Sequence, residues 1–178
     1  MNETQQALPG LDAIVKPFKF TSSAYEFRVT ALRECPLPEN MMICDTPAQA
    51  SNYWRMHVTT NPYFNPECEC FVVLILNTRR RVKGHHMVSV GTMDTILVHP
   101  REVFRLAVVT NAAAIVLMHN HPSGESTPSS ADITVTRDLI RAGQLLKIEV
   151  LDHVVIGQPD GDSQKGCLSL RELGYFYS

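Results

Sequence analysis

A short apolar segment that runs directly into two histidines limits what this chain can fold into. Residues 112–118 are apolar throughout, which predicts a strand covered on both faces of a sheet. His119 and His121 follow at the carboxyl end of that strand. Side chains two positions apart on an extended chain point the same way, so both imidazoles are expected to face one point and Asn120 to face away from it.

The residues after the histidines predict a turn and then a helix. Pro122 ends the strand and Gly124 turns the chain. Thr127 and Pro128 are expected to open the helix, with the threonine as N-cap and the proline in the first helical position. Apolar residues recur at helical spacing as far as Leu146. This helix is expected to pack against the sheet.

Ser129 and Asp132 lie three residues apart on the predicted helix and therefore share a face. Two imidazoles from the strand end and one carboxylate from the helix are expected to converge on one cation. This ligand set leaves a fourth position to water, which is typical of a catalytic zinc ion and not of a closed structural one. The sequence predicts one Zn²⁺ per chain, held by His119, His121 and Asp132.

The motif that the histidines, Ser129 and Asp132 form resembles the signature of a known family. The chain contains HNHP at 119–122 and SSAD at 129–132, which together resemble the JAMM signature (HxHP, a short spacer, SxxD) of the JAB/MPN metalloprotease superfamily. The strings HNHPSG, PSSAD and LDHVVIG are similar to the RadC-like bacterial branch, and the likeness runs from about Glu67 to about Gly174. The resemblance implies an α/β fold: a mixed β-sheet flanked by helices, in a three-layer arrangement like that of cytidine deaminases.

The resemblance also implies a catalytic glutamate at the start of a strand beside the metal. Residues 65–76 predict an apolar strand entered through Glu67 and Glu69, which share a strand face. The family pattern, with a glutamate one residue before the apolar run, points to Glu69, and Glu67 is the alternative. Ser129 is expected to donate a hydrogen bond to the oxyanion of the reaction. Capping of its own helix is the other role, disfavoured because Thr127 is the better placed cap.

The implied activity is that of a JAMM-type metallopeptidase, which hydrolyses an amide bond in a peptide or protein substrate. The cation would lower the pKa of its water from about 15.7 to about 7, and Glu69 would pass the proton from that water to the leaving amine. The bond is a peptide or an isopeptide bond. A nucleoside deaminase is disfavoured, because such enzymes carry HxE and PCxxC and this chain has neither.

The alternative is a non-catalytic protein- or DNA-associated binding module with a structural or vestigial metal site. Intact HxHP and SxxD residues disfavour it, as does the net charge of −2, which creates no general attraction to nucleic acid. The basic residues within 79–83 are expected to form a solvated turn that blunts a sheet edge. Residues 1–65 contain no recognisable helix-hairpin-helix DNA-binding region. DNA association is therefore the less favoured interaction.

The remaining sequence bounds the domain. Residues 1–22 are polar and aperiodic, which predicts a loosely ordered N-terminal segment, and residues 23–178 are expected to form a single JAB/MPN domain. No apolar run approaches the ~20 residues that span a bilayer, and the first residues lack the pattern of a secretory signal. The chain is expected to be cytoplasmic, without membrane partners. Its five cysteines include no CxxC pair, so they predict neither a disulfide framework nor a cysteine zinc site.

Several further elements follow from local patterns. Alternation predicts strands over residues 25–32 and 147–156. Pro47 is expected to open a helix that runs to about Thr59 with Trp54 in the core, and Pro100 is expected to open another helix. Residues 169–174 are expected to form a short capped helix. Asp152 and His153 lie on the strand over 147–156 and are expected to point to opposite faces, so at most one of them faces the site directly.

Overall fold

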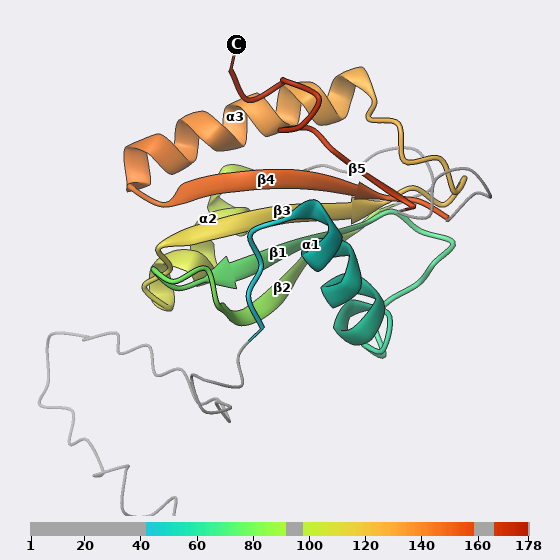
Figure 1. The fold of residues 1–178 in the computed structure, drawn as a ribbon, viewed down its shortest axis with the longest axis horizontal. Coiled ribbons are helices and arrows are strands. Elements are labelled where there is room, and N and C mark those ends of the chain that lie inside the picture. The colour runs from blue at the N-terminus through green and yellow to red at the C-terminus, as the bar shows by residue number, and fades with distance from the viewer. Residues whose placement is uncertain (1–41, 92–97, 159–165, 178) are drawn as a thin grey trace, which may run out of the picture. The chain divides into compact units, whose positions relative to one another are not determined.

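The computed structural model describes residues 42–91, 98–158 and 166–177. The expected segment 1–22 and the expected strand 25–32 lie outside these residues. A five-stranded sheet has the order β2-β1-β3-β4-β5 (Figure 1). Its strands are β1 (Cys70–Leu76), β2 (Val82–Val90), β3 (Ala114–Asn120), β4 (Glu149–Ile156) and β5 (Cys167–Ser169). β3 and β4 are parallel and the other neighbouring pairs are antiparallel, so the sheet is mixed as predicted.

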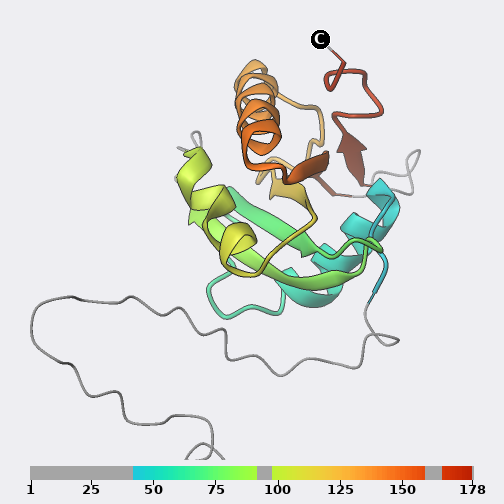
Figure 2. The same cartoon turned by 90° about the vertical axis from the view of Figure 1, so that its left-hand side faces the viewer.

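Helices cover both faces of this sheet, as the two views of the ribbon show (Figures 1 and 2). α1 (Pro47–Tyr53) continues into a π-helical turn, η2 (Trp54–Val58), and both pack on one face. α2 (Pro100–Val109) and α3 (Ser130–Leu146) pack on the other. The predicted α/β class, with a mixed sheet between helices, is confirmed. In the part of the chain that the structure describes, no helix has the length and apolarity needed to cross a membrane.

α1 begins where its sequence predicts. Thr46 is the N-cap: its hydroxyl accepts a hydrogen bond from the backbone N–H of Gln49, and the Gln49 side chain accepts one from the backbone N–H of Thr46. Pro47 occupies the first helical position, where its missing N–H costs nothing. The helical segment continues to Val58, and Trp54 is buried in the core with its ring edge-on to Phe64, as the sequence predicts.

Alternation along β1 and β3 divides their side chains between two cores. Even-numbered residues of both strands pack toward α1 and η2, and odd-numbered residues pack toward α2 and α3. Both strands are buried on both faces, which explains why their sequences are apolar throughout. Extending this alternation past the strand ends directs Glu69, His119 and His121 to the α3 side of the sheet. The fold thereby gathers the polar residues of two strand ends under one helix.

β4 breaks its own alternation. Ile115 of β3 pairs with Val150, but the next residue of β3 pairs with Asp152, so Leu151 is an extra residue in a β-bulge. Leu151 and Asp152 therefore both face the side of α1, where they line one cavity. His153 consequently faces the side of α3.

The predicted helix over 169–174 is wrong. β5 ends at Ser169 and a series of turns follows it. The Ser169 hydroxyl accepts a hydrogen bond from the backbone N–H of Glu172 at 3.0 Å and donates to the Asp152 carboxylate at 2.7 Å. The hydroxyl that resembles a helix cap in sequence thus ties the turn to β4, and the chain does not continue as a helix.

Candidate metal centre

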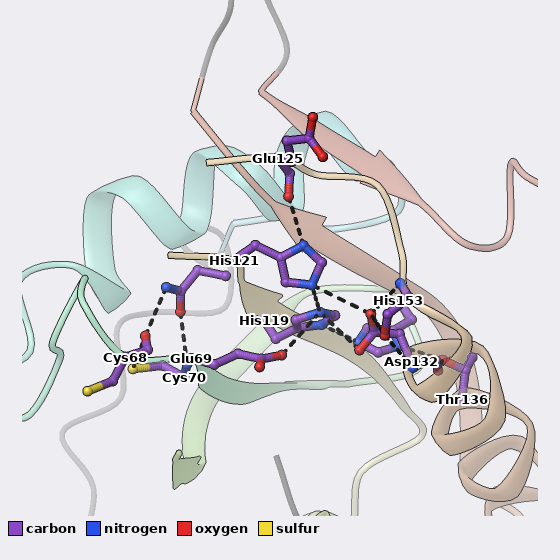
Figure 3. Close-up of polar contacts among 11 residues, drawn as sticks. Cys68, Glu69, Cys70, His119, His121, Glu125, Asp132, Thr136 and His153 are labelled. Carbon is purple, nitrogen blue, oxygen red and sulfur yellow. Dashed lines mark hydrogen bonds and ion pairs between the residues drawn. The ribbon is translucent and has the colours of Figure 1, made fainter. Parts of the chain in front are cut away.

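Four polar side chains meet at the carboxyl end of β3 (Figure 3). Glu69, His119, His121 and Asp132 each offer one ligand atom, and these atoms lie within 4.8 Å of one another. Glu69 directly precedes β1, the histidines end β3 and begin the loop after it, and Asp132 lies in the first turn of α3. Glu67, the alternative to Glu69, is exposed and is not a member of this group.

The separations within the group suit a small tetrahedral cation. His119 Nε2 lies 3.1 Å from His121 Nε2 and 3.3 Å from Asp132 Oδ1. His121 Nε2 lies 3.5 Å from Asp132 Oδ2. Tetrahedral ligands at about 2.0–2.1 Å from zinc are separated from one another by about 3.3 Å. The two imidazoles and the carboxylate therefore fit a zinc ion, and Glu69 Oε1, 3.6 Å from His119 Nε2, lies beside them.

The carboxyl groups of this cluster differ in their electrostatics. Burial raises the pKa of Glu69, and although the two histidines lower it, the pKa stays above its usual value. Burial also raises the pKa of Asp132, but its interactions with the imidazoles of His119 and His121 outweigh burial and hold it below its usual range. The hydrogen bond with Asp132 in turn raises the pKa of His121. Asp132 is thus ionised at neutral pH, the form that ligates metals, whereas Glu69 is more basic than an ordinary glutamate.

The start of α3 corrects one prediction. The N-cap is Ser129 and not Thr127, and the helix begins at Ser130. The Ser129 hydroxyl accepts from the backbone N–H of Asp132 at 3.1 Å, and the Asp132 carboxylate Oδ2 accepts from the backbone N–H of Ser129 at 2.7 Å. This reciprocal capping box satisfies two backbone donors, whereas a threonine cap at 127 would satisfy one. The capping role that the sequence disfavoured for Ser129 is therefore present, and its catalytic role stays a prediction.

The capping box also orients the Asp132 carboxylate. Its Oδ2 additionally accepts a hydrogen bond from the Ser129 hydroxyl at 2.7 Å, while its Oδ1 faces His119. The ring of His121 is held separately, because its Nδ1 donates to the backbone carbonyl of Glu125 at 2.7 Å. This bond occupies the Nδ1–H and directs Nε2, the atom that would bind a cation, into the group.

Comparisons with known proteins identify the family of this domain. The family described as the RadC-like JAB domain matches residues 44–175 of the chain. The chain belongs to this family.

Curated relatives of this RadC-like domain carry the name UPF0758 protein. One from Caldanaerobacter subterraneus is 45% identical over 108 residues, which are 61% of this chain and 44% of that protein. One from Thermosynechococcus vestitus is 43% identical over 136 residues, 76% of this chain and 50% of that protein. One from Desulfitobacterium hafniense is 56% identical over 106 residues, 60% of this chain and 44% of that protein. The chain thus spans about half the length of these relatives or less.

In this RadC-like domain Asn120 has a role that sequence reasoning missed. Its side chain points away from the candidate ligands, as expected, and makes two hydrogen bonds. Its Oδ1 accepts a hydrogen bond from the backbone N–H of Cys70 at 2.9 Å, and its Nδ2 donates to the backbone carbonyl of Cys68 at 3.0 Å. The amide therefore fixes the backbone on both sides of Glu69. The sequence feature that could have indicated this role is an amide residue at the strand end, on the face opposite to the histidines.

The structure shows which of Asp152 and His153 on β4 faces the candidate metal centre: it is His153. Its Nε2 lies 2.8 Å from Nδ1 of His119 (Figure 3). Asp152 lies on the other face, where its carboxylate accepts hydrogen bonds from the Ser169 hydroxyl and from backbone N–H groups. Of the pair, His153 is the residue that touches the candidate metal centre of the RadC-like domain.

Proposed function

We propose that this domain is a metal-dependent hydrolase of the JAMM type, which uses zinc to cleave a peptide or isopeptide amide bond in a peptide or protein substrate. The observation that carries the proposal is the spacing of two imidazoles and one carboxylate, which suits a tetrahedral cation, with a basic glutamate beside them. Three protein ligands leave one position for water or substrate, as in catalytic zinc sites.

The roles of the surrounding residues follow from their places. When bound, zinc supplies Lewis acidity, which polarises a carbonyl group and lets water ionise at about pH 7. Glu69 Oε1 accepts the proton of the attacking water and delivers it to the nitrogen of the leaving amine. Its partial burial raises its pKa and so strengthens it as a base.

Ser129 is proposed to stabilise the oxyanion. Its hydroxyl donates to Asp132 Oδ2 at 2.7 Å, and rotation about the Cβ–Oγ bond would redirect the hydroxyl proton from the carboxylate to the substrate while Oγ keeps its place as the helix cap. The interaction strengthens as negative charge develops on the substrate oxygen, which is the condition for lowering the barrier.

The second candidate function is a non-catalytic protein- or DNA-associated module. Basic residues of the turn between β1 and β2 and of the start of β2 have partners within the fold. Arg80 of the turn forms an ion pair with Glu149 at 2.9 Å, and the ammonium group of Lys83 on β2 donates to the backbone carbonyl of Thr110. Cations engaged in this way are less available to phosphate groups, which favours the hydrolase.

The test begins with the metal. Protein purified without chelator is analysed for zinc beside His121→Ala, with folding followed by circular dichroism. We expect about one zinc per folded wild-type chain and its loss from the folded variant. Peptide and isopeptide libraries are then offered to wild type, Glu69→Gln and the matched control Glu67→Gln.

The outcomes separate the two functions. A hydrolase loses about 100-fold or more of its activity in Glu69→Gln, keeps its zinc and is unaffected by Glu67→Gln. A folded wild type that takes up no zinc, even when zinc is supplied, overturns the proposal. A zinc-loaded wild type that cleaves neither library points to the binding module, whereas cleavage that is equally fast in wild type and Glu69→Gln removes Glu69 as the base.

A further inference from the structure

His153 is buried, with 1% of its surface exposed, and both of its ring nitrogens have partners. Its Nε2 lies 2.8 Å from Nδ1 of His119, and its Nδ1 lies 2.5 Å from the hydroxyl of Thr136. That hydroxyl lies 2.5 Å from the backbone carbonyl of Asp132. A line of hydrogen bonds therefore runs from the side chain of one candidate ligand to the backbone of another, across β3, β4 and α3 (Figure 3).

The chemistry of these groups sets the direction of every bond in the line. A backbone carbonyl only accepts, so the Thr136 hydroxyl donates its proton to Asp132. The hydroxyl then has only lone pairs left for His153, whose Nδ1 must donate. A neutral imidazole carries a single N–H, so Nε2 of His153 accepts, and Nδ1 of His119 donates to it. Nε2 of His119 is left with a free lone pair that faces His121 and Asp132.

The surroundings keep His153 neutral and its bonds directional. Its nitrogens contact an imidazole and a hydroxyl and not a carboxylate, and a buried histidinium without an anionic partner is costly. The Phe71 ring lies parallel to the His119 ring at 6.2 Å and edge-on to the His153 ring at 5.4 Å. This apolar cover strengthens the hydrogen bonds and limits their exchange with water.

We propose that His153 and Thr136 are positioning residues, which hold His119 in its Nδ1–H tautomer and so present its Nε2 lone pair to the cation. The inference rests on the proposed function for the existence of the metal site, but it assigns work to two residues outside the ligand set. A metal-ligating histidine is commonly oriented by its second nitrogen, and loss of that partner typically weakens metal binding 10–100-fold. Here the partner is another histidine, whose own tautomer is set by a threonine.

The tautomer is tested first without any substitution or metal. The ¹⁵N chemical shifts of histidine rings distinguish Nδ1–H from Nε2–H forms. In the metal-free wild type we expect His119 in the Nδ1–H form and His153 in the Nδ1–H form as well. Finding His119 in the Nε2–H form would overturn the proposal, whatever the protein then does with zinc.

Variants test the consequence for the metal. Zinc affinity is measured by competition with a chelator for Thr136→Val, which keeps the shape but removes the hydroxyl, and for Thr136→Ser, which restores it. His153→Phe removes the acceptor altogether. We expect Thr136→Val and His153→Phe to bind zinc about 10–100-fold more weakly, and Thr136→Ser to bind as wild type. Thr136→Val is also expected to give a mixture of His119 tautomers.

His85→Phe is the matched control. His85 is a part-buried histidine that, like His153, has a hydroxyl partner, in this case Tyr53, but it lies on β2. Its zinc affinity is expected to equal that of the wild type. If wild type binds zinc and both Thr136→Val and His153→Phe bind it equally well, the positioning role fails while the hydrolase proposal stands. If wild type binds none, the proposed function itself fails, and the ¹⁵N spectrum still decides the tautomer.

Discussion

The carboxylate of Asp132 is shared between a helix cap and the candidate metal centre. Its Oδ2 closes the capping box with Ser129, and its Oδ1 faces His119. One side chain thus fixes where α3 begins and where a ligand atom lies, so the geometry of the helix start is also the geometry of the site. At the scale of single residues, structural and chemical roles are combined here and are separable only by matched substitutions.

Ser129 allows such a separation. Ser129→Ala removes the cap and is expected to lower the free energy of unfolding by about 0.5–2 kcal/mol, as measured by chemical denaturation. If the hydroxyl also stabilises an oxyanion, kcat falls by about 100-fold or more. Ser129→Thr keeps both hydrogen-bonding functions and is expected to retain most of both quantities. Unchanged kcat in Ser129→Ala would reduce this residue to a cap.

The cysteines give a prediction that depends on pH. Burial raises the pKa of the Cys44 thiol to about 12, so the reactive thiolate is scarce at pH 8 and grows only as the pH approaches 12. Cys68 is only half-buried. Brief iodoacetamide treatment of the folded protein at pH 8, followed by mass spectrometry, is expected to modify Cys68 and leave Cys44 intact. Unfolding in denaturant should expose both, and prompt labelling of Cys44 in the folded protein would contradict its burial.

At the scale of elements, strand ends and their connections carry the site. β1 is entered through an irregular segment, and Asn120 of β3 holds that segment by bonding to the backbone of Cys68 and Cys70. An amide side chain with one donor and one acceptor matches a backbone carbonyl and N–H, so it extends the pairing between β1 and β3 where regular strand pairing ends. The position of Glu69 therefore depends on a residue 51 positions away in sequence.

Asn120→Ala is expected to uncouple Glu69 from the metal ligands. It leaves a buried N–H and a carbonyl without their partner, which costs about 1–3 kcal/mol of stability. Hydrolytic activity is expected to fall together with the stability. The zinc affinity is expected to stay within a few-fold of wild type, because His119, His121 and Asp132 are untouched. Asn120→Asp, which accepts but cannot donate, should fall between the two. Loss of zinc in a folded Asn120→Ala would show that the amide supports the ligands as well.

The close contact between α3 and the segment that leads into β4 gives a prediction about packing. A Cβ at Gly143 would lie 2.5 Å from the backbone carbonyl oxygen of Ile148 and 3.3 Å from the Phe104 ring. Alanine favours a helix over glycine by about 1 kcal/mol, but the clash is expected to outweigh this preference and destabilise the protein by about 1–3 kcal/mol. Gln144→Ala at the neighbouring exposed position is the control. A higher melting temperature for Gly143→Ala would contradict the close contact.

At the scale of the whole molecule, the two cores share one sheet, and the candidate metal centre lies at one end of it, between β1, β3 and α3. A cation held by His119, His121 and Asp132 would add a direct link between the end of β3 and the start of α3. Metal binding and folding stability are therefore coupled, since a ligand that binds only the folded state stabilises it.

Removal of metal is expected to lower the melting temperature. At a free zinc concentration 100-fold above Kd, binding adds about 2.7 kcal/mol to the free energy of unfolding. Scanning calorimetry of chelator-treated and zinc-loaded protein should show this shift, and His121→Ala should show little of it. An equal shift in the folded His121→Ala variant would place the stabilising zinc elsewhere.

The sequence by itself determined the features that depend on local periodicity. The alternation of side chains along a strand directs His119 and His121 to one side of β3 and Asn120 to the other, because successive side chains of any extended chain point to opposite faces. Apolar runs identify strands buried on both faces, and the start of α1 follows from a threonine before a proline. The choice of Glu69 over Glu67 came from a family pattern, and in the structure Glu69 is the one that joins the group.

Tertiary structure decided what depends on register and on partners distant in sequence. Simple alternation pairs Leu151 with His153 on one face of β4, but the bulge at Leu151 separates them and sends His153 to His119. Ser129 displaces Thr127 as the cap because its partner Asp132 bonds back to it. Strand alternation is a property of the backbone and is visible in any short segment, whereas a bulge or a cap is selected by the packing and hydrogen bonds of the folded chain.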